Sequence, residues 1–167
     1  MDLSDAFEYA APVLRSEEGM RMHYIPVPPD VAEAIREAGT RRIVGTLNGH
    51  PIRRALHGIG NGAYQLWIGK KALREIGSAY GETVEVALAP DPDPDHVEVP
   101  EELRAALDQN DEARERWDGW TPGRQRSAAI HITQAKRPAT RVKRALELTH
   151  KMATYTLYDD LKRDEGA

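Results

Sequence analysis

The densest group of side chains able to do chemistry is a basic segment in the last third of the chain. It contains Lys136, Arg137, Thr140, Arg141 and Arg144. Arg141 and Arg144 are three residues apart and share one face of a predicted helix, and Arg137 stands just before the helix begins. Forked guanidinium groups suit phosphate and carboxylate groups. The segment is therefore our candidate site for an anionic partner, and the alternative is that it neutralises the acidic remainder of the chain.

Charge is distributed unevenly along the sequence. The whole chain has a formal net charge of −4. Residues 121–151 contain eight basic residues and a single acid, Glu147, so this segment carries +7 and the remainder carries −11. A local excess of this kind favours an anionic partner, either a protein or a nucleic acid. Nucleic-acid binding is our second hypothesis and is not the favoured one.

The sequence has no recognisable catalytic or metal-binding pattern. It lacks cysteine, which excludes disulfides, thiol catalysis and cysteine-ligated zinc. Its six histidines never pair at a spacing of four, and no serine lies in a G-x-S-x-G elbow. The glycines at 58, 60 and 62 join two predicted strands, whereas a nucleotide-binding loop joins a strand to a helix. We expect a protein that is not an enzyme and has no catalytic residues, cofactor or metal.

A third hypothesis is a small-molecule pocket in the predicted β-domain. The residues for it would be His50, Arg53 and Trp67, which combine a titratable ring, a cation and an aromatic surface. No acid–base or nucleophile pair accompanies them. An enzyme with such a pocket therefore ranks last among the three hypotheses.

Residues 41–88 are predicted to organise the N-terminal part of the chain. Asn48-Gly49 is the strongest short hairpin signal, since both residues accept positive φ. Strands are expected at 41–47, 50–56, 63–69 and 82–89, with a two-turn helix at 70–77 that buries Leu73 and Ile76. Short strands at this spacing favour a closed barrel. We therefore predict an α+β fold with a mainly β core.

The segment Pro90-Asp-Pro-Asp-Pro-Asp95 marks the end of this region. Its aspartates mimic calcium ligands, but a calcium loop needs glycine at its sixth position, where this chain has His96. Each proline fixes φ and keeps the segment extended. We interpret it as a stiff, solvated link, and we place the β-barrel domain at residues 1–99 and a helical segment at 100–167.

The pattern beyond Pro100 is helical. Asn110 is suited to cap one helix, Thr121-Pro122 opens another, and Pro138 opens the last clear one. Apolar residues at i, i+3 and i+6 in the tail predict that it either extends the helical bundle or frays: Tyr155, Tyr158 and Leu161.

Two further expectations concern location and assembly. No run approaches the roughly 18 apolar residues of a membrane span. The acidic N-terminus lacks the basic region of a signal peptide, so a cytoplasmic protein is the default expectation. We expect a monomer or a weak homodimer.

Several separated motifs resemble known bacterial families. Residues from about 7 to 107 resemble domain of unknown function 1905, and residues from about 110 to 148 resemble the YdeI/OmpD-associated segment (OmdA), also called bacteriocin-protection. The first resemblance is carried by Tyr24-Ile-Pro-Val-Pro, Arg42-Ile-Val-Gly-Thr-Leu-Asn-Gly-His-Pro, Gly62-Ala-Tyr, Gly81-Glu-Thr-Val-Glu-Val and Val97-Glu-Val-Pro. The second is carried by Ile132-Thr-Gln-Ala-Lys-Arg-Pro-Ala-Thr-Arg-Val-Lys-Arg.

These resemblances imply a fold and a class of function. The first implies a small double-split β-barrel related to AbrB-type proteins, which bind DNA as dimers, followed by a helical appendage. The second implies protection against bacteriocins. Neither family supplies catalytic residues. We therefore expect a binding, stress-protection or antimicrobial-peptide-protection protein that uses its basic helical face, and the residues from Thr149 onward lie outside what the resemblance informs.

Overall fold

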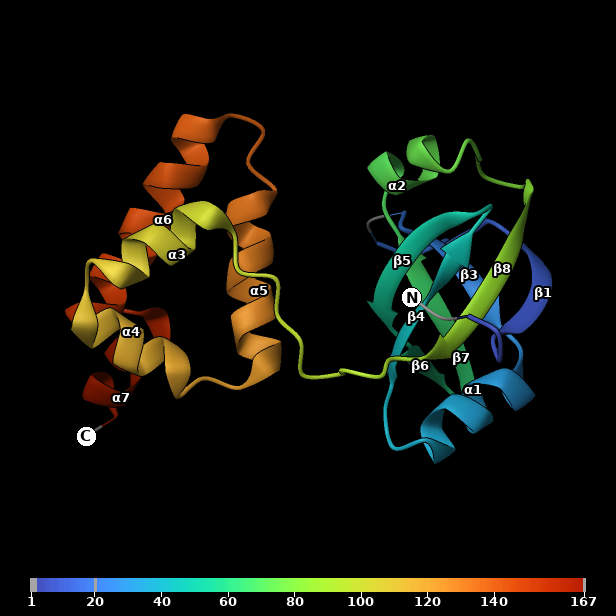
Figure 1. Ribbon diagram of the computed structural model, residues 1–167, viewed down its shortest axis with the longest axis horizontal. Helices are drawn as coiled ribbons and strands as arrows, with labels where there is room; N and C mark the ends of the chain where they lie inside the picture. Colours follow the sequence, from blue (N-terminus) through green and yellow to red (C-terminus); the bar gives the residue numbers. More distant parts are fainter. Residues whose placement is uncertain (1–2, 20, 167) are drawn as a thin grey trace. The chain divides into compact units, whose positions relative to one another are not determined.

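The computed structural model describes residues 3–19 and 21–166. The chain divides into two compact units, Met1–Pro94 (unit 1) and Asp95–Ala167 (unit 2). Within these described residues, unit 1 contains every strand together with two helices, and unit 2 is helical (Figure 1). The predicted α+β class is confirmed. Among the residues described, no helix is long and apolar enough to cross a membrane.

Unit 1 is built from two four-stranded antiparallel sheets. The first sheet has the order β1-β8-β4-β5, with bounds Phe7–Pro12, Thr83–Pro90, Arg42–Leu47 and His50–Ala55. The second has the order β2-β3-β7-β6, with bounds Leu14–Arg15, His23–Val27, Ala63–Ile68 and His57–Gly60. Only Val13 separates β1 from β2 and only Leu56 separates β5 from β6, so the chain passes between the sheets at these two buried residues.

The prediction of a closed barrel is wrong, because the strands pair as two separate sheets. Val13 and Leu56 each extend the register of the first sheet by one hydrogen bond: the N–H of Val13 donates to the Glu82 carbonyl and the N–H of Leu56 donates to the Arg41 carbonyl. The residues that follow them, Leu14 and His57, pair in the second sheet, so the ladders form two sheets. The unit has one hydrophobic core, with six of its fully buried members at Ile25, Ile43, Leu47, Leu66, Val84 and Leu88.

The short elements of unit 1 follow the local signals in the sequence. Asn48 and Gly49 have φ values of 47° and 81°, as a two-residue hairpin turn of this kind requires. The Asn48 side chain also accepts from the N–H of Glu85 at 2.9 Å and donates to the Ile76 carbonyl at 3.2 Å. Helix α1 (Pro29–Glu37) buries Ile35, and α2 (Lys70–Glu75) buries Leu73. The Asn-Gly turn thus also ties α2 to β8.

Unit 2 consists of α3 (Glu101–Asp108), α4 (Asp111–Asp118), α5 (Pro122–Thr133), α6 (Pro138–Ala153) and α7 (Tyr158–Glu165). The predicted starts are confirmed: Asn110 caps α4, Thr121 caps α5, and a proline occupies the first position of both α5 and α6. Helices α3, α4 and α5 all pack against α6. Their buried apolar residues form a second core, which includes Leu103, Leu107, Trp117, Ile132, Ala145 and Met152.

Helix α7 is attached to unit 2 by a polar contact. Arg116 of α4 makes a bidentate ion pair with Asp160, at 2.9 and 3.0 Å, and also donates to the Met152 carbonyl at 2.8 Å. Asp160 is 5% exposed, and the N–H of Leu157 donates to its carboxylate. The tail therefore extends the bundle. The aromatic and apolar residues expected to hold it are exposed instead: Tyr155, Tyr158 and Leu161.

Candidate anion-binding site

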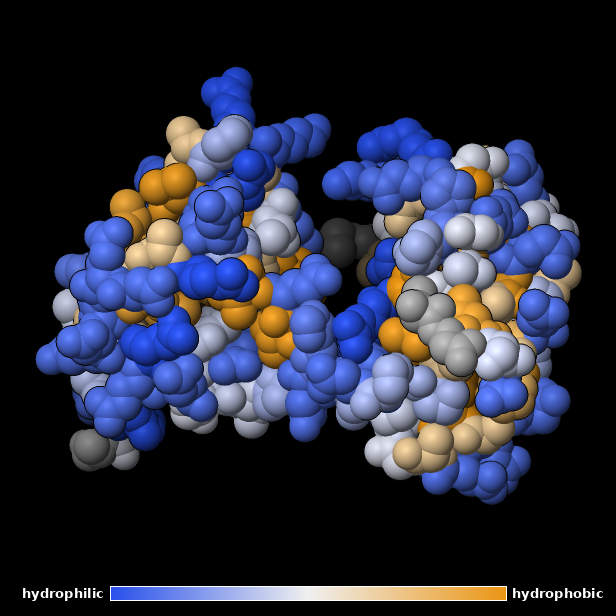
Figure 2. All heavy atoms as spheres, viewed as in Figure 1, coloured by the Kyte–Doolittle hydropathy of each residue, from blue (hydrophilic) through white to orange (hydrophobic). Residues whose placement is uncertain are grey.

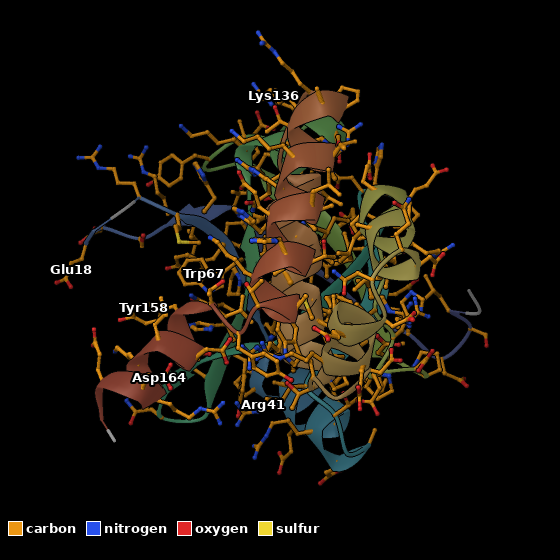
Figure 3. The ribbon with its side chains drawn as sticks, turned by 90° about the vertical axis from the view of Figure 1, so that its left-hand side faces the viewer. Glu18, Arg41, Trp67, Lys136, Tyr158 and Asp164 are labelled. Carbon is orange, nitrogen blue, oxygen red and sulfur yellow. The ribbon has the colours of Figure 1, made fainter. Side chains whose placement is uncertain are left out.

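The structure brings the five residues of the predicted basic site to one corner of unit 2. Helix α5 ends at Thr133, and α6 begins at Pro138 because proline is pre-organised for a first helical position. Lys136 and Arg137 lie in the turn between the two helices, and Thr140, Arg141 and Arg144 lie in the first two turns of α6. In Figure 3, Lys136 marks the end of α6 at which this corner lies.

The side chain of Arg141 is bound within unit 2. Its Nε donates to Glu102 Oε1 of α3 at 2.9 Å. Its Nη1 donates to two carbonyl oxygens of the turn, those of Ala135 at 3.1 Å and Lys136 at 3.3 Å. The Arg141 guanidinium thereby holds the pKa of the Glu102 carboxyl below its usual value. This side chain joins α3, the turn and α6.

Arg144 has a similar role at the end of α5. Its Nη1 donates to the carbonyl of His131 at 2.6 Å. That carbonyl belongs to the last turn of α5, where the backbone oxygens have no partner within the helix and the helix dipole is negative. A guanidinium there satisfies an oxygen and neutralises the dipole. Arg144 therefore fixes the angle between α5 and α6.

Lys136 and Arg137 are different, because their charges face solvent. Both are exposed, and within residues 3–19 and 21–166 neither makes a hydrogen bond through its side chain or an ion pair. Arg137 is the N-cap residue of α6 but provides no side-chain cap, and the first turn of α6 contains no acid. Thr140 is half-buried in that first turn. The positive end of the α6 dipole is therefore flanked by two available cations.

Much of the remaining basic excess is used within unit 2. Arg124 pairs with Asp159 at 3.2 Å, and its guanidinium lies 4.1 Å from the centre of the Trp120 ring. Lys143 lies 3.9 Å from Glu147, one turn further along α6. The residues of the basic segment thus fall into two groups. Arg124, Arg141 and Arg144 serve the fold, whereas Lys136 and Arg137 are available to a partner.

The residues suggested for a pocket in unit 1 are not brought together. Arg53 forms a bidentate pair with Asp91, at 2.6 and 2.7 Å. His50 contacts the carbonyl of Asn48 through Nδ1 at 3.2 Å. Trp67 belongs to the other sheet and packs against Tyr24 and His57, with ring centroids 5.9 and 5.3 Å away. Each of these three side chains therefore contacts different residues, and they do not line a common pocket.

Asp91 corrects the interpretation of the proline–aspartate segment as uniformly solvated. Its side chain has no exposed surface, and it accepts from Arg53 and from the N–H of Asp93 at 2.9 Å. Its own N–H donates to the Arg42 carbonyl, which extends the β4–β8 ladder. The hydrogen bonds from Arg53 hold the pKa of Asp91 below its usual value, against the opposing effect of burial. Asp91 thus ends β8 as a structural anchor.

The comparisons with known families cover both units. The family described as domain of unknown function (DUF1905) matches residues 9–88. The family described as bacteriocin-protection, YdeI or OmpD-associated (OmdA) matches residues 96–154, which include α3 to α6 and leave α7 outside. No curated protein matches the chain. The resemblance to both families is therefore confirmed, with the DUF1905 match preceding the OmdA match in the order that the motifs predict.

Proposed function

We propose that this chain is a non-enzymatic binding protein whose unit 2 presents Lys136 and Arg137 to an anionic partner, within a bacteriocin-protection role. The observation that carries the proposal is a difference among the basic-site residues: some bind groups within unit 2, and others face solvent. Arg141 and Arg144 use their donors on backbone and carboxylate oxygens of unit 2. Lys136 and Arg137 are exposed and have no side-chain partner within the described parts of the chain.

The local geometry suits a carboxylate or a phosphate. A carboxylate at this corner would meet two cations and the positive end of a 16-residue helix. Thr140 adds a hydroxyl in the first turn of the same helix. Arg141 donates to the carbonyl of Lys136, so the backbone that carries the lysine is fixed before a partner arrives.

Unit 1 acts as the scaffold in this proposal. Its finer architecture would be a double-split barrel related to AbrB-type proteins. Two features support this: the chain changes sheet at Val13 and Leu56, and α2 leads through a tight turn into β8. The side chains proposed for a pocket in this unit are engaged separately, which favours a scaffold over an enzyme.

The direct test reverses the two available charges. The double variant Lys136→Glu/Arg137→Glu should abolish protection against a bacteriocin and weaken binding of the anionic partner by at least about tenfold, since two attractive contacts become repulsive. The matched control is Lys70→Glu/Lys71→Glu, which reverses two exposed cations of α2. Protection by the Lys136/Arg137 variant at the level of the unaltered chain would refute the proposal.

Nucleic-acid binding is separated from this function by its dependence on salt. Contacts from Lys136 and Arg137 alone predict a slope of about −2 for log K against log salt. Fluorescence anisotropy with random duplex and single-stranded oligonucleotides at low salt measures it. Tight binding with a slope steeper than about −4 would require more phosphate contacts than two cations make, and it would favour the nucleic-acid hypothesis.

A further inference from the structure

Helix α6 has a second solvent-facing feature beside the two available cations. Val142 and Leu146 are 45% and 54% exposed, and they lie four residues apart on one side of the helix. The side of α6 that packs into unit 2 is formed by other residues, among them Ala145, Thr149 and Met152. Figure 2 shows hydrophobic side chains at the surface where α6 lies in Figure 1. Val142 is three residues from Ala145 and Leu146 is three residues from Thr149, so the exposed pair lies at the edge of the buried stripe and continues it into water.

Basic residues border this exposed apolar pair. Lys143 lies between Val142 and Leu146 in sequence, and Lys136 and Arg137 precede the helix at the end nearer Val142. His150 is exposed one turn beyond Leu146. Between residues 136 and 151 the only acid is Glu147. We call this surface, formed by Lys136, Arg137, Val142, Lys143 and Leu146, the α6 face.

We propose that the α6 face binds an acidic amphipathic helix of a partner protein. This inference rests on the proposed function and names the class of its anionic partner. An amphipathic helix places apolar residues at i, i+3 and i+4 and charged residues beside them, which matches Val142 and Leu146 flanked by cations. The partner's apolar stripe would cover Val142 and Leu146, and its carboxylates would pair with Lys136 and Arg137.

Charge also decides between a peptide and an anionic membrane. The remaining residues of unit 2, 95–120 and 152–167, hold 13 acids and five basic residues, a net −8. A membrane is an extended surface that would also meet acidic parts of this chain, whereas one helix covers only the α6 face. Two exposed apolar side chains are, in addition, a small area to insert among lipids. The observations therefore favour a peptide helix.

The test uses two synthetic fluorescent peptides of about 18 residues, roughly five helical turns. One carries leucine at i, i+3, i+4 and i+7 with glutamate on its flanks. The other has the same composition with the leucines dispersed around the helix. Anisotropy with the full chain should show binding of the patterned peptide, and binding of the dispersed peptide at least about tenfold more weakly. Vesicles of phosphatidylglycerol form a separate arm.

Two double variants separate the apolar contribution to peptide binding from the contribution of charge. Val142→Ser/Leu146→Ser keeps every charge and should weaken binding of the patterned peptide about tenfold to a hundredfold, because two half-exposed side chains no longer become buried. Lys136→Glu/Arg137→Glu should weaken the binding of both peptides, because both carry glutamate. Both pairs of positions are exposed, so we expect both variants to fold, and circular dichroism checks this.

Each outcome has a defined meaning. Equal binding of the two peptides, unaffected by Val142→Ser/Leu146→Ser but lost in Lys136→Glu/Arg137→Glu, would overturn the amphipathic-helix proposal and leave the proposed function standing. Binding to vesicles without binding to either peptide would overturn it in favour of a membrane. Binding to none of the three probes, together with full protection by the charge-reversal variant, would overturn both proposals.

Discussion

Replacing Asp91 with asparagine tests how unit 1 ends its last strand. The carboxylate accepts two hydrogen bonds from Arg53 and one from the N–H of Asp93, and its side chain is fully buried. Asparagine is the same size but presents an NH₂ group in place of one acceptor oxygen. One of the Arg53 donors then faces another donor. The substitution therefore removes the ion pair without changing the packing volume.

The expected loss is about 2 kcal/mol in the free energy of unfolding of unit 1. Breaking a fully buried ion pair costs about 3–5 kcal/mol because the remaining charge loses its partner. Arg53 is 32% exposed, so water partly solvates its guanidinium after the change and lowers that cost. The matched control is Asp95→Asn, an exposed aspartate of the same segment, with an expected change within about 0.5 kcal/mol.

Hydrogen exchange followed by mass spectrometry is the suitable assay, because peptides from β4 and β8 report unit 1 separately from unit 2. The pH dependence provides a second check. The folded pKa of Asp91 is lowered, so the stabilisation is present above the unfolded pKa of about 3.9 and is lost as the pH falls through the folded value. A difference between the unaltered chain and Asp91→Asn below about 0.5 kcal/mol at pH 7 would refute the reasoning.

Two further predictions concern packing and the tail. Gly45→Ala should cost about 3 kcal/mol or prevent folding of unit 1, because a Cβ there would overlap the Ala87 carbonyl and lie 3.0 Å from its carbon. Gly69→Ala has open space and should cost less than about 1 kcal/mol in thermal unfolding, from the poorer N-cap of α2 alone. Arg116 lowers the pKa of Asp160, so the stabilisation of α7 by this pair is present above the unfolded pKa and is lost on acidification. The protection of α7 amides against exchange, relative to an unfolded chain at the same pH, should fall in acid before that of α6 amides, and Asp160→Asn should lower it already at pH 7.

Local signals in the sequence predicted the elements well, because each depends on a few adjacent residues. The Asn48-Gly49 turn, the proline at the start of α6 and the Asn110 cap all appear where their chemistry places them. The alternation of Val84, Val86 and Leu88 likewise predicts which face of β8 is buried. The sheet-to-sheet change at Val13 has no such signal. A single buried residue between two extended runs has the same local pattern as an uninterrupted strand.

Ion pairs could not be assigned from the sequence for a different reason. Arg53 and Asp91 are 38 residues apart, Arg141 and Glu102 are 39 apart, and Arg116 and Asp160 are 44 apart. Charges carry no periodic pattern that selects one partner among the chain's 27 acidic residues. The sequence therefore predicts where the basic segment lies and that its net charge is positive. Which of its cations form ion pairs or hydrogen bonds within the fold depends on how the helices pack.

That division gives the basic segment its function in our proposal. If every cation of residues 121–151 faced solvent, a partner would have to order many flexible side chains on binding, each at an entropic cost. Here Arg141 fixes the turn through the carbonyls of Ala135 and Lys136, and Arg144 fixes the end of α5. Only the side chains of Lys136 and Arg137 remain to be ordered at this corner. In this proposal, arginines that would not touch the partner set the position of the two cations that would.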